Sequence, residues 1–278
     1  MTIKILSPLW GHEHLPLVPF LERIREAGYD GIEAAVPEDP SDKRLLFDYL
    51  DRHGMCRVAH QHQAQGATFQ AFRESFAANL HLCAENAPLL INSHTGRDYF
   101  SLEQLIVLVD IAQEFTGKTG IPVVHETHRG RMGYAPQAAA PLFSLREDLQ
   151  ITADFSHWVC VTESMLENFE DLLTEAIRRS RHIHARIGFE EAPQVPDPRT
   201  PRWGYAVNHF LSWWDQIVEH NAQHKTPVLP ITTEFGPPPY MAVTEPGGLP
   251  AQDQFELNTY MLGLLRDRYN RYCQPPLR

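Results

Sequence analysis

Short apolar runs alternate with amphipathic segments about eight times along this chain of 278 residues. The apolar runs have the length of buried strands, and the segments between them have helical spacing. Strict alternation predicts a parallel sheet with right-handed crossovers, and eight units predict its closure into an α/β fold of the (β/α)8 TIM barrel type. Since such barrels run to about 200–250 residues as one domain, we expect residues 1–278 to form a single domain. The predicted strands are 1–7, 29–34, 55–62, 88–92, 121–126, 151–154, 182–186 and 228–234.

The main alternative is a doubly wound open sheet. That fold usually carries a glycine-rich phosphate loop after its first strand. Here the first strand leads into Pro8-Leu9-Trp10-Gly11-His12, which is not such a loop, so the barrel is favoured. Between the strands, apolar residues at helical spacing predict a helix from Leu17 that stops at Gly28, and one amphipathic helix over 165–177.

Four predicted strands end on side chains that bind metals. They are Glu126, Asp154, His184 and Glu234. The carboxyl ends of all barrel strands meet on one face, where barrel enzymes keep their active sites. Three carboxylates and one imidazole can therefore surround one divalent ion, and this donor set favours Mn, Mg or Co, with Zn possible.

Histidines also gather at the predicted strand ends. Ten of the fifteen histidines lie at or just past such an end, which surface solubility does not explain. Alternation along the strand places His182, His184 and Arg186 on one face. The ten are His12, His14, His60, His62, His94, His125, His128, His157, His182 and His184.

Composition limits the partners. The formal net charge of −11 argues against nucleic acid, because a nucleic-acid binder should present a basic stripe. The chain has no apolar stretch of 18 residues, and residues 1–7 read as a strand instead of a signal peptide, so we expect a cytoplasmic protein without membrane contact. The four cysteines are scattered and contain no metal-binding pair.

Several segments resemble the xylose isomerase-like TIM barrel superfamily, the sugar phosphate isomerase/epimerase family. The superfamily includes sugar epimerases, hydroxypyruvate isomerase, inosose dehydratase and endonuclease IV. The resemblance covers nearly the whole chain. The segments that carry it are Gly28-Tyr29-Asp30-Gly31-Ile32-Glu33, His125-Glu126-Thr127-His128, Asp154-Phe155-Ser156-His157, His182-Ile183-His184 and Thr233-Glu234-Phe235-Gly236.

This resemblance implies roles for individual residues. Glu126, Asp154, His184 and Glu234 correspond to the family's metal ligands, and both glutamates also move protons in the epimerases. His157 corresponds to a histidine that reaches the substrate. Arg186 suits the oxygens of the same substrate, because a guanidinium fits a carboxylate or phosphate. Further substrate-binding candidates are Glu33, His60, His94, His128, Arg129 and Trp10, with Trp203 as another wall residue.

The expected function is a metal-dependent isomerase or epimerase of a small sugar, sugar phosphate or hydroxy-keto compound that acts through an enediolate. A metal-dependent dehydratase on the same site, a non-catalytic sugar-binding barrel and a nuclease are the alternatives. The chain departs from the ketose 3-epimerases at Met132 and Glu190, where that group carries a glutamate and an arginine. Arg129 and Arg131 favour an anionic substrate such as a sugar phosphate or sugar acid.

The chain also gives a weak indication of a homo-oligomer. An exposed Trp213 or the Pro-rich segment 190–203 could form a subunit contact, and that segment could also form a wall of the pocket.

Overall fold

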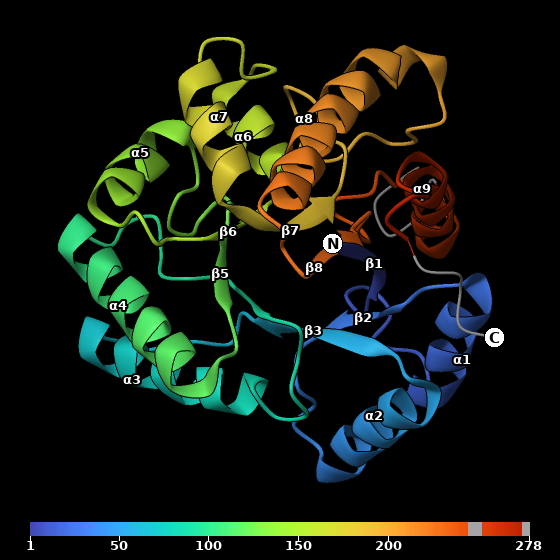
Figure 1. The fold of residues 1–278 in the computed structure, drawn as a ribbon, viewed down its shortest axis with the longest axis horizontal. Helices are drawn as coiled ribbons and strands as arrows, with labels where there is room; N and C mark the ends of the chain where they lie inside the picture. The colour runs from blue at the N-terminus through green and yellow to red at the C-terminus, as the bar shows by residue number, and fades with distance from the viewer. Residues whose placement is uncertain (244–251, 274–278) are drawn as a thin grey trace.

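Eight parallel strands close into a barrel in the computed structural model, which describes residues 1–243 and 252–273 (Figure 1). Each strand pairs with the next along the chain, and the first pairs with the eighth through Thr2↔Val228 to Leu6↔Thr232. The predicted (β/α)8 barrel is therefore confirmed, and the open doubly wound sheet is excluded. The strands are β1 (Thr2–Pro8), β2 (Gly31–Ala34), β3 (Cys56–Gln61), β4 (Ile91–Ser93), β5 (Val123–Glu126), β6 (Ile151–Ala153), β7 (Ser180–Ala185) and β8 (Val228–Thr233).

Helices form a ring around these strands (Figure 1). Local signals in the sequence account for several helix ends. The first helix stops where Gly28 adopts a φ of 95°, and the fourth begins with a capping box between Ser101 and Gln104. The helices are α1 (Leu17–Ala27), α2 (Pro40–His53), α3 (Phe69–Cys83), α4 (Leu102–Thr119), α5 (Pro136–Leu145), α6 (Phe155–Thr162), α7 (Glu170–Arg179), α8 (Gly204–Gln223) and α9 (Gln254–Arg268), with a 3-10 turn η1 at Pro201–Trp203.

The prediction of one helix over 165–177 is wrong. Two helices follow β6 in place of one. Asp154 caps α6 through a hydrogen bond from the Ser156 amide to its carboxylate, so the chain turns helical directly after the strand. Leu166 then has a φ of 63°, which no helix accommodates, and α7 begins only at Glu170.

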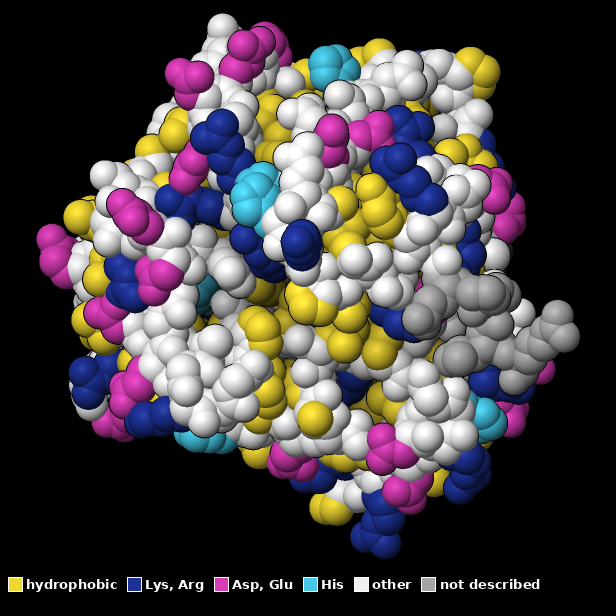
Figure 2. Space-filling model, viewed as in Figure 1, with side chains coloured by type: hydrophobic (Ala, Val, Ile, Leu, Met, Phe, Trp, Pro, Cys, Tyr) yellow, Lys and Arg dark blue, Asp and Glu magenta, His cyan; other side chains and the backbone are white. Residues whose placement is uncertain are grey.

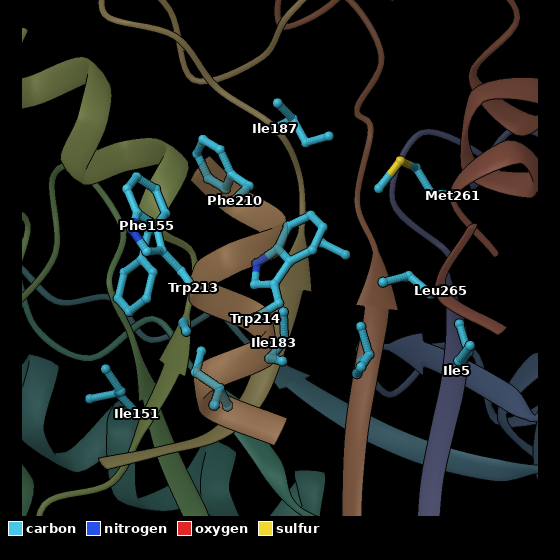
Figure 3. Packing of buried hydrophobic residues seen from close by; sticks show 14 of the residues in the cluster. Ile5, Ile151, Phe155, Ile183, Ile187, Phe210, Trp213, Trp214, Met261 and Leu265 are labelled. Carbon is cyan, nitrogen blue, oxygen red and sulfur yellow. The ribbon is translucent and has the colours of Figure 1, made fainter. Parts of the chain in front are cut away.

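The main hydrophobic core fills the space between strands and helices. Figure 3 shows Phe210 and Trp214 of α8 near Ile183 of β7. Trp213 is only 5% exposed, and its ring lies 4.9 Å from Phe210 and 6.0 Å from Phe155. The expectation that Trp213 is exposed for a subunit contact is therefore wrong.

The Pro-rich segment 190–203 folds back on the barrel. The amide of Val195 bonds to the carbonyl of Ile187, and Trp203 is buried with its ring 4.7 Å from Phe189. This segment thus packs against the barrel.

On the face of the molecule in Figure 2, acidic and basic side chains are interspersed. Within the described residues, every helix is too short or too polar to cross a bilayer.

Candidate metal centre and active site

Contacts between strands on opposite sides of the barrel define its polar interior. Glu33 of β2 lies 3.0 Å from Nε2 of His184 on β7, and Asn92 of β4 lies 3.2 Å from the same nitrogen. Neither β2 nor β4 pairs with β7, so these side chains meet inside the barrel. A separate inner cluster of apolar side chains comes from β1, β3, β5 and the residue before β4. It comprises Leu6, Val58, Leu90 and Val124. The barrel interior is thus packed as well as polar.

Glu126, Asp154, His184 and Glu234 converge at the strand ends. Each offers one ligand atom, and these atoms all lie within 4.8 Å of one another. Nδ1 of His184 is 2.8 Å from Oε2 of Glu234 and 3.6 Å from Oε1 of Glu126. All four residues are buried. The strand-end spacing in the sequence therefore corresponds to spatial proximity.

Three of these ligand atoms have no hydrogen-bond partner among the described residues. They are Oε1 of Glu126, Nδ1 of His184 and Oε2 of Glu234. The short approach of the last two is a charge contact without hydrogen-bond geometry. Buried polar atoms are normally paired, so three unpaired atoms in one cluster fit a group that binds all of them. The cluster could hold a divalent metal ion.

Asp154 is bound more tightly than the other three. Its Oδ1 accepts hydrogen bonds from the amide of Ser156 at 3.2 Å and from the Ser156 hydroxyl at 2.5 Å. Its Oδ2 pairs with Nη2 of Arg186. Arg186 also donates from Nε to the Ser156 hydroxyl at 3.1 Å, and its Nη2 lies 2.8 Å from Nε2 of His157. Arg186 and His157 are therefore fixed beside the cluster.

The charges of the cluster shift its protonation equilibria. Burial opposes the protonation of His184, but Glu234, Glu33 and Glu126 outweigh it and raise the pKa of His184 well above its usual value. Burial also opposes ionisation of Glu126, yet His94 and His184 hold its pKa well below the usual range. For Glu234 burial prevails and raises the pKa to about 7. The two glutamates thus sit in different electrostatic environments.

Asn92 supports the cluster, although the sequence analysis did not identify it. Its amide donates to Oε1 of Glu33 at 2.9 Å and to Oε2 of Glu126 at 2.7 Å. His94 contacts the same oxygen of Glu126 at 3.0 Å. Glu33 accepts a further bond of 2.6 Å from Thr232. The carboxylate of Glu126 is therefore oriented by two neighbours.

Histidine rings extend from the cluster along one wall. The centroids of His60 and His94 are 4.6 Å apart, those of His94 and His128 are 4.4 Å apart, and those of His128 and His157 are 4.0 Å apart. Three further groups of possible ligands share a residue with the four-residue cluster, and two of these groups also contain histidines of this wall. They are Glu33–His182–His184, His60–His94–Glu126 and Glu126–His128–His157.

A cavity of about 980 Å³ opens above the cluster. Of the residues predicted to bind substrate or metal, Asp154, His157, His184 and Arg129 do not line it. The guanidinium of Arg129 instead lies 5.0 Å from the ring centre of Tyr240. The predicted residues that line the cavity are Trp10, Glu33, His60, His94, Glu126, His128, Arg186 and Glu234.

Tyr240 lines the cavity but was missed from the sequence. It follows β8 after a cis bond between Pro238 and Pro239. Its ring is 5.0 Å from that of Trp10 and 4.8 Å from the guanidinium carbon of Arg186. A tyrosine beyond two prolines carries no sequence signal that places it over a site.

Two buried amide side chains hold the backbone that follows Glu234. Asn258 of α9 accepts from the amide of Phe235 and donates to its carbonyl, both at 2.8 Å. Gln194 pairs in the same way with Gly236, at 2.7 and 3.3 Å. The Pro-rich segment therefore supports the site through Gln194, although none of its residues lines the described cavity.

The two positions that depart from the ketose 3-epimerases lie away from the cavity lining. Met132 is buried, and its amide bonds to the carbonyl of Thr95. Glu190 accepts a 2.8 Å hydrogen bond from the hydroxyl of Tyr205. Both side chains are engaged elsewhere in the fold.

Comparison with known proteins gives a likeness of fold. No family model matches the chain, and no curated protein sequence matches it. The crystal structure of the probable 3-DHS dehydratase AsbF from Bacillus anthracis, involved in petrobactin synthesis, aligns with a TM-score of 0.62 and 15% identity, covering 96% of this chain and 100% of that one. The apo crystal structure of the 3-keto-D-glucoside 4-epimerase YcjR from E. coli aligns with a TM-score of 0.60 and 14% identity, covering 95% and 99%. Both alignments cover nearly the whole of each chain, so they confirm the (β/α)8 barrel fold that the predicted resemblance implies.

Proposed function

We propose that this protein is a divalent-metal-dependent isomerase or epimerase of a small sugar, sugar phosphate or hydroxy-keto compound. The observation that carries the proposal is the convergence of Glu126, Asp154, His184 and Glu234 within 4.8 Å. Three of these side chains have a possible ligand atom without a hydrogen-bond partner in the part of the chain that the structure describes. These four residues would hold the ion. The two solved structures of similar fold, a probable dehydratase and an epimerase, support a sugar-modifying enzyme.

The donor set also favours particular metals. Three carboxylates and one imidazole suit Mn, Mg or Co, and zinc remains compatible. A divalent ion bound by a carbonyl oxygen and its neighbouring hydroxyl would withdraw charge from the substrate and so stabilise an enediolate.

Glu126 and Glu234 suit proton transfer on two sides of one carbon. Glu126 lies on β5, and Glu234 follows β8 directly. Nδ1 of His184 lies 3.6 Å from Oε1 of Glu126 and 2.8 Å from Oε2 of Glu234. Both line the cavity, so both can reach a bound substrate. One carboxylate can take a proton from the carbon and the other can return one from the opposite side, which inverts the configuration of that carbon. Return of a proton to the neighbouring carbon instead moves the carbonyl group.

Neighbouring side chains would orient the substrate. Arg186 lines the cavity, and its guanidinium is held by Asp154 and His157. It can donate to substrate oxygens without losing its position. The rings of Trp10 and Tyr240, 5.0 Å apart, offer faces on which the C–H face of a sugar can stack.

A dehydratase on the same residues is the second candidate. The similarity in fold to a probable 3-DHS dehydratase favours it. Elimination of water begins with the same abstraction of a proton beside a carbonyl, and Glu126 or Glu234 could perform it. Analysis of the product separates the two reactions, because only elimination lowers its mass by one water.

Metal analysis and proton exchange test the proposal. The purified protein is loaded with Mn, Co or Mg, and a panel of ketoses, ketose phosphates and hydroxy-ketones is incubated with it in D₂O. We expect about one ion per chain and deuterium incorporation at the carbon beside the carbonyl. Exchange should disappear when Glu126→Gln and Glu234→Gln are combined. The matched control is Glu191→Gln, because Glu191 is an exposed carboxylate outside the cavity lining. Exchange that persists in the double variant would contradict the mechanism.

A further inference from the structure

The cavity above the cluster has two unlike walls. Its polar wall follows β3, β4 and β5 and includes His60, His94 and His128. A second wall is formed by residues 8–17 and 34–38, around the loops that follow β1 and β2, and is mainly apolar. Leu9, Leu15, Val36 and other apolar side chains of these loops line it. The cavity that Glu126 and Glu234 line therefore has a polar and an apolar region.

The volume exceeds what one sugar ring requires. About 980 Å³ lies at the upper end of the range of roughly 300–1,000 Å³ found for pockets that bury drug-sized ligands. A small hydroxy-ketone bound at Glu126 and Glu234 would leave the space along the apolar loops without contacts. An apolar surface that faces such a space contributes to affinity only when an apolar group covers it.

The charge at the outer end of the cavity limits which substrate groups can bind there. Glu13 and Glu38, of the loops after β1 and β2, and Asp42, in the first turn of α2, are exposed and line the cavity. The cations among the described lining residues are Arg131 and Arg186, and both belong to other segments. Three carboxylates at this end repel a negatively charged group of the substrate. An anionic group is therefore disfavoured at the outer end, whatever charge the reacting end carries.

We propose that the substrate carries an uncharged apolar group, such as the aglycone of an aryl or alkyl glycoside, that lies against the loops 8–17 and 34–38. This inference rests on the proposed function for the placement of the reacting end. The apolar wall itself is independent of any catalytic step. Leu15 and Val36 become specificity residues, because they contact the part of the substrate that does not react.

Binding of three matched probes tests this inference. The probes are phenyl β-D-glucoside, D-glucose and 4-carboxyphenyl β-D-glucoside, titrated by ligand-observed NMR into the Mn-loaded protein. Burial of a phenyl ring should make phenyl β-D-glucoside bind at least about tenfold more tightly than D-glucose. The carboxyphenyl compound should lose at least about half of that gain, because of the outer carboxylates.

Variants locate the effect. Leu15→Asp and Val36→Asp should each weaken the binding of phenyl glucoside about tenfold and leave the binding of D-glucose unchanged. If the aspartates disturb folding, Leu15→Ala should still give a smaller loss of affinity for phenyl glucoside. The control is Leu45→Asp, since Leu45 is 47% exposed and does not line the cavity. Failure of the phenyl glucoside to bind, or equal binding of phenyl glucoside and D-glucose, overturns the inference. So does a Leu15→Asp protein with unchanged preference.

The outcome is separable from the proposed function. The variant with Glu126→Gln and Glu234→Gln should keep its preference for the phenyl group, because the apolar wall is intact. If the preference is present but no proton exchange occurs with any compound of the panel, the proposed function fails and the binding inference stands. If exchange occurs without the preference, the binding inference alone fails.

Discussion

Asn92→Ala tests the geometry of the site without removing any predicted metal ligand. The side chain of Asn92 is fully buried and donates to Glu33 and Glu126 at 2.9 and 2.7 Å. A hydrogen bond to a charged group contributes about 1.5–3 kcal/mol. Two such bonds give an upper value of about 6 kcal/mol. Because Glu33 keeps Thr232 and Glu126 keeps His94 as partners, we expect a loss near the lower end, about 3 kcal/mol.

The same substitution should weaken metal binding. Without the amide, His94 is the remaining hydrogen-bond partner of the Glu126 carboxylate among those described above. Loss of a group that orients a metal ligand typically lowers affinity about 10–100-fold. Urea unfolding of the metal-free protein measures the first effect, and calorimetric titration with Mn²⁺ measures the second.

Asn221→Ala is the matched control for this variant. Asn221 is equally buried, and its amide donates to the carbonyls of Ser180 and Ile217, both at 2.9 Å. It makes no contact with the cluster, so its loss should cost about 2–3 kcal/mol of stability and leave the Mn²⁺ affinity unchanged. If Asn92→Ala binds Mn²⁺ within about twofold of the native protein, or if Asn221→Ala loses as much affinity, the reasoning is refuted.

Three further predictions follow from other parts of the structure. Gly236→Ala would place a Cβ 2.1 Å from the Trp10 ring, so the ring must move and we expect a raised KM. The control is Gly117→Ala, where a Cβ meets no described residue within 4 Å, and this variant should leave KM unchanged. The pKa of His184 is raised and a ligand imidazole must be neutral, so Mn²⁺ binding should release a proton and should tighten as pH rises. Identical calorimetric enthalpies of Mn²⁺ binding in buffers of different ionisation enthalpy would contradict this release. Burial lowers the pKa of His125 to about 4 from 6.5, so the unfolded chain binds a proton at this histidine at a higher pH than the folded chain does. Stability should therefore fall as pH drops from about 6.5 to about 4, by on the order of 3 kcal/mol. Urea midpoints of His125→Gln should show a correspondingly smaller fall over the same pH range.

The barrel and the four-residue cluster were predictable for the same physical reason. Parallel strands that alternate with helices must place their carboxyl ends on one face, so acids and histidines at those ends converge whatever their separation in sequence. Glu126, Asp154, His184 and Glu234 meet for this reason. Helix ends with strong local signals, such as Gly28, were predictable as well.

The errors arose where tertiary packing overrides a local pattern. Apolar residues over 165–177 continue a helical period, yet Leu166 turns into a left-handed conformation and only the last part is helical. Trp213 lies beside Trp214 on α8, and the helical pattern did not reveal that the ring of Trp213 is covered as well. The ring of Trp213 lies near Phe155 of α6, a helix that the sequence analysis did not predict.

Asn92 shows what a residue's chemistry alone leaves undetermined. An asparagine within a strand cannot ionise, so its residue type alone suggests no part in proton transfer. Its importance comes from register, because Asn92 pairs with His60 on β3 and with Val124 on β5, and its amide then faces side chains 34 and 59 residues away in sequence. A shift of one residue would turn Asn92 outward and bring its neighbours Ile91 and Ser93 to the interior. The identity of ionisable residues at strand ends therefore predicts the kind of chemistry, whereas the register of the short β4 decides which neutral side chain holds the carboxylates in place.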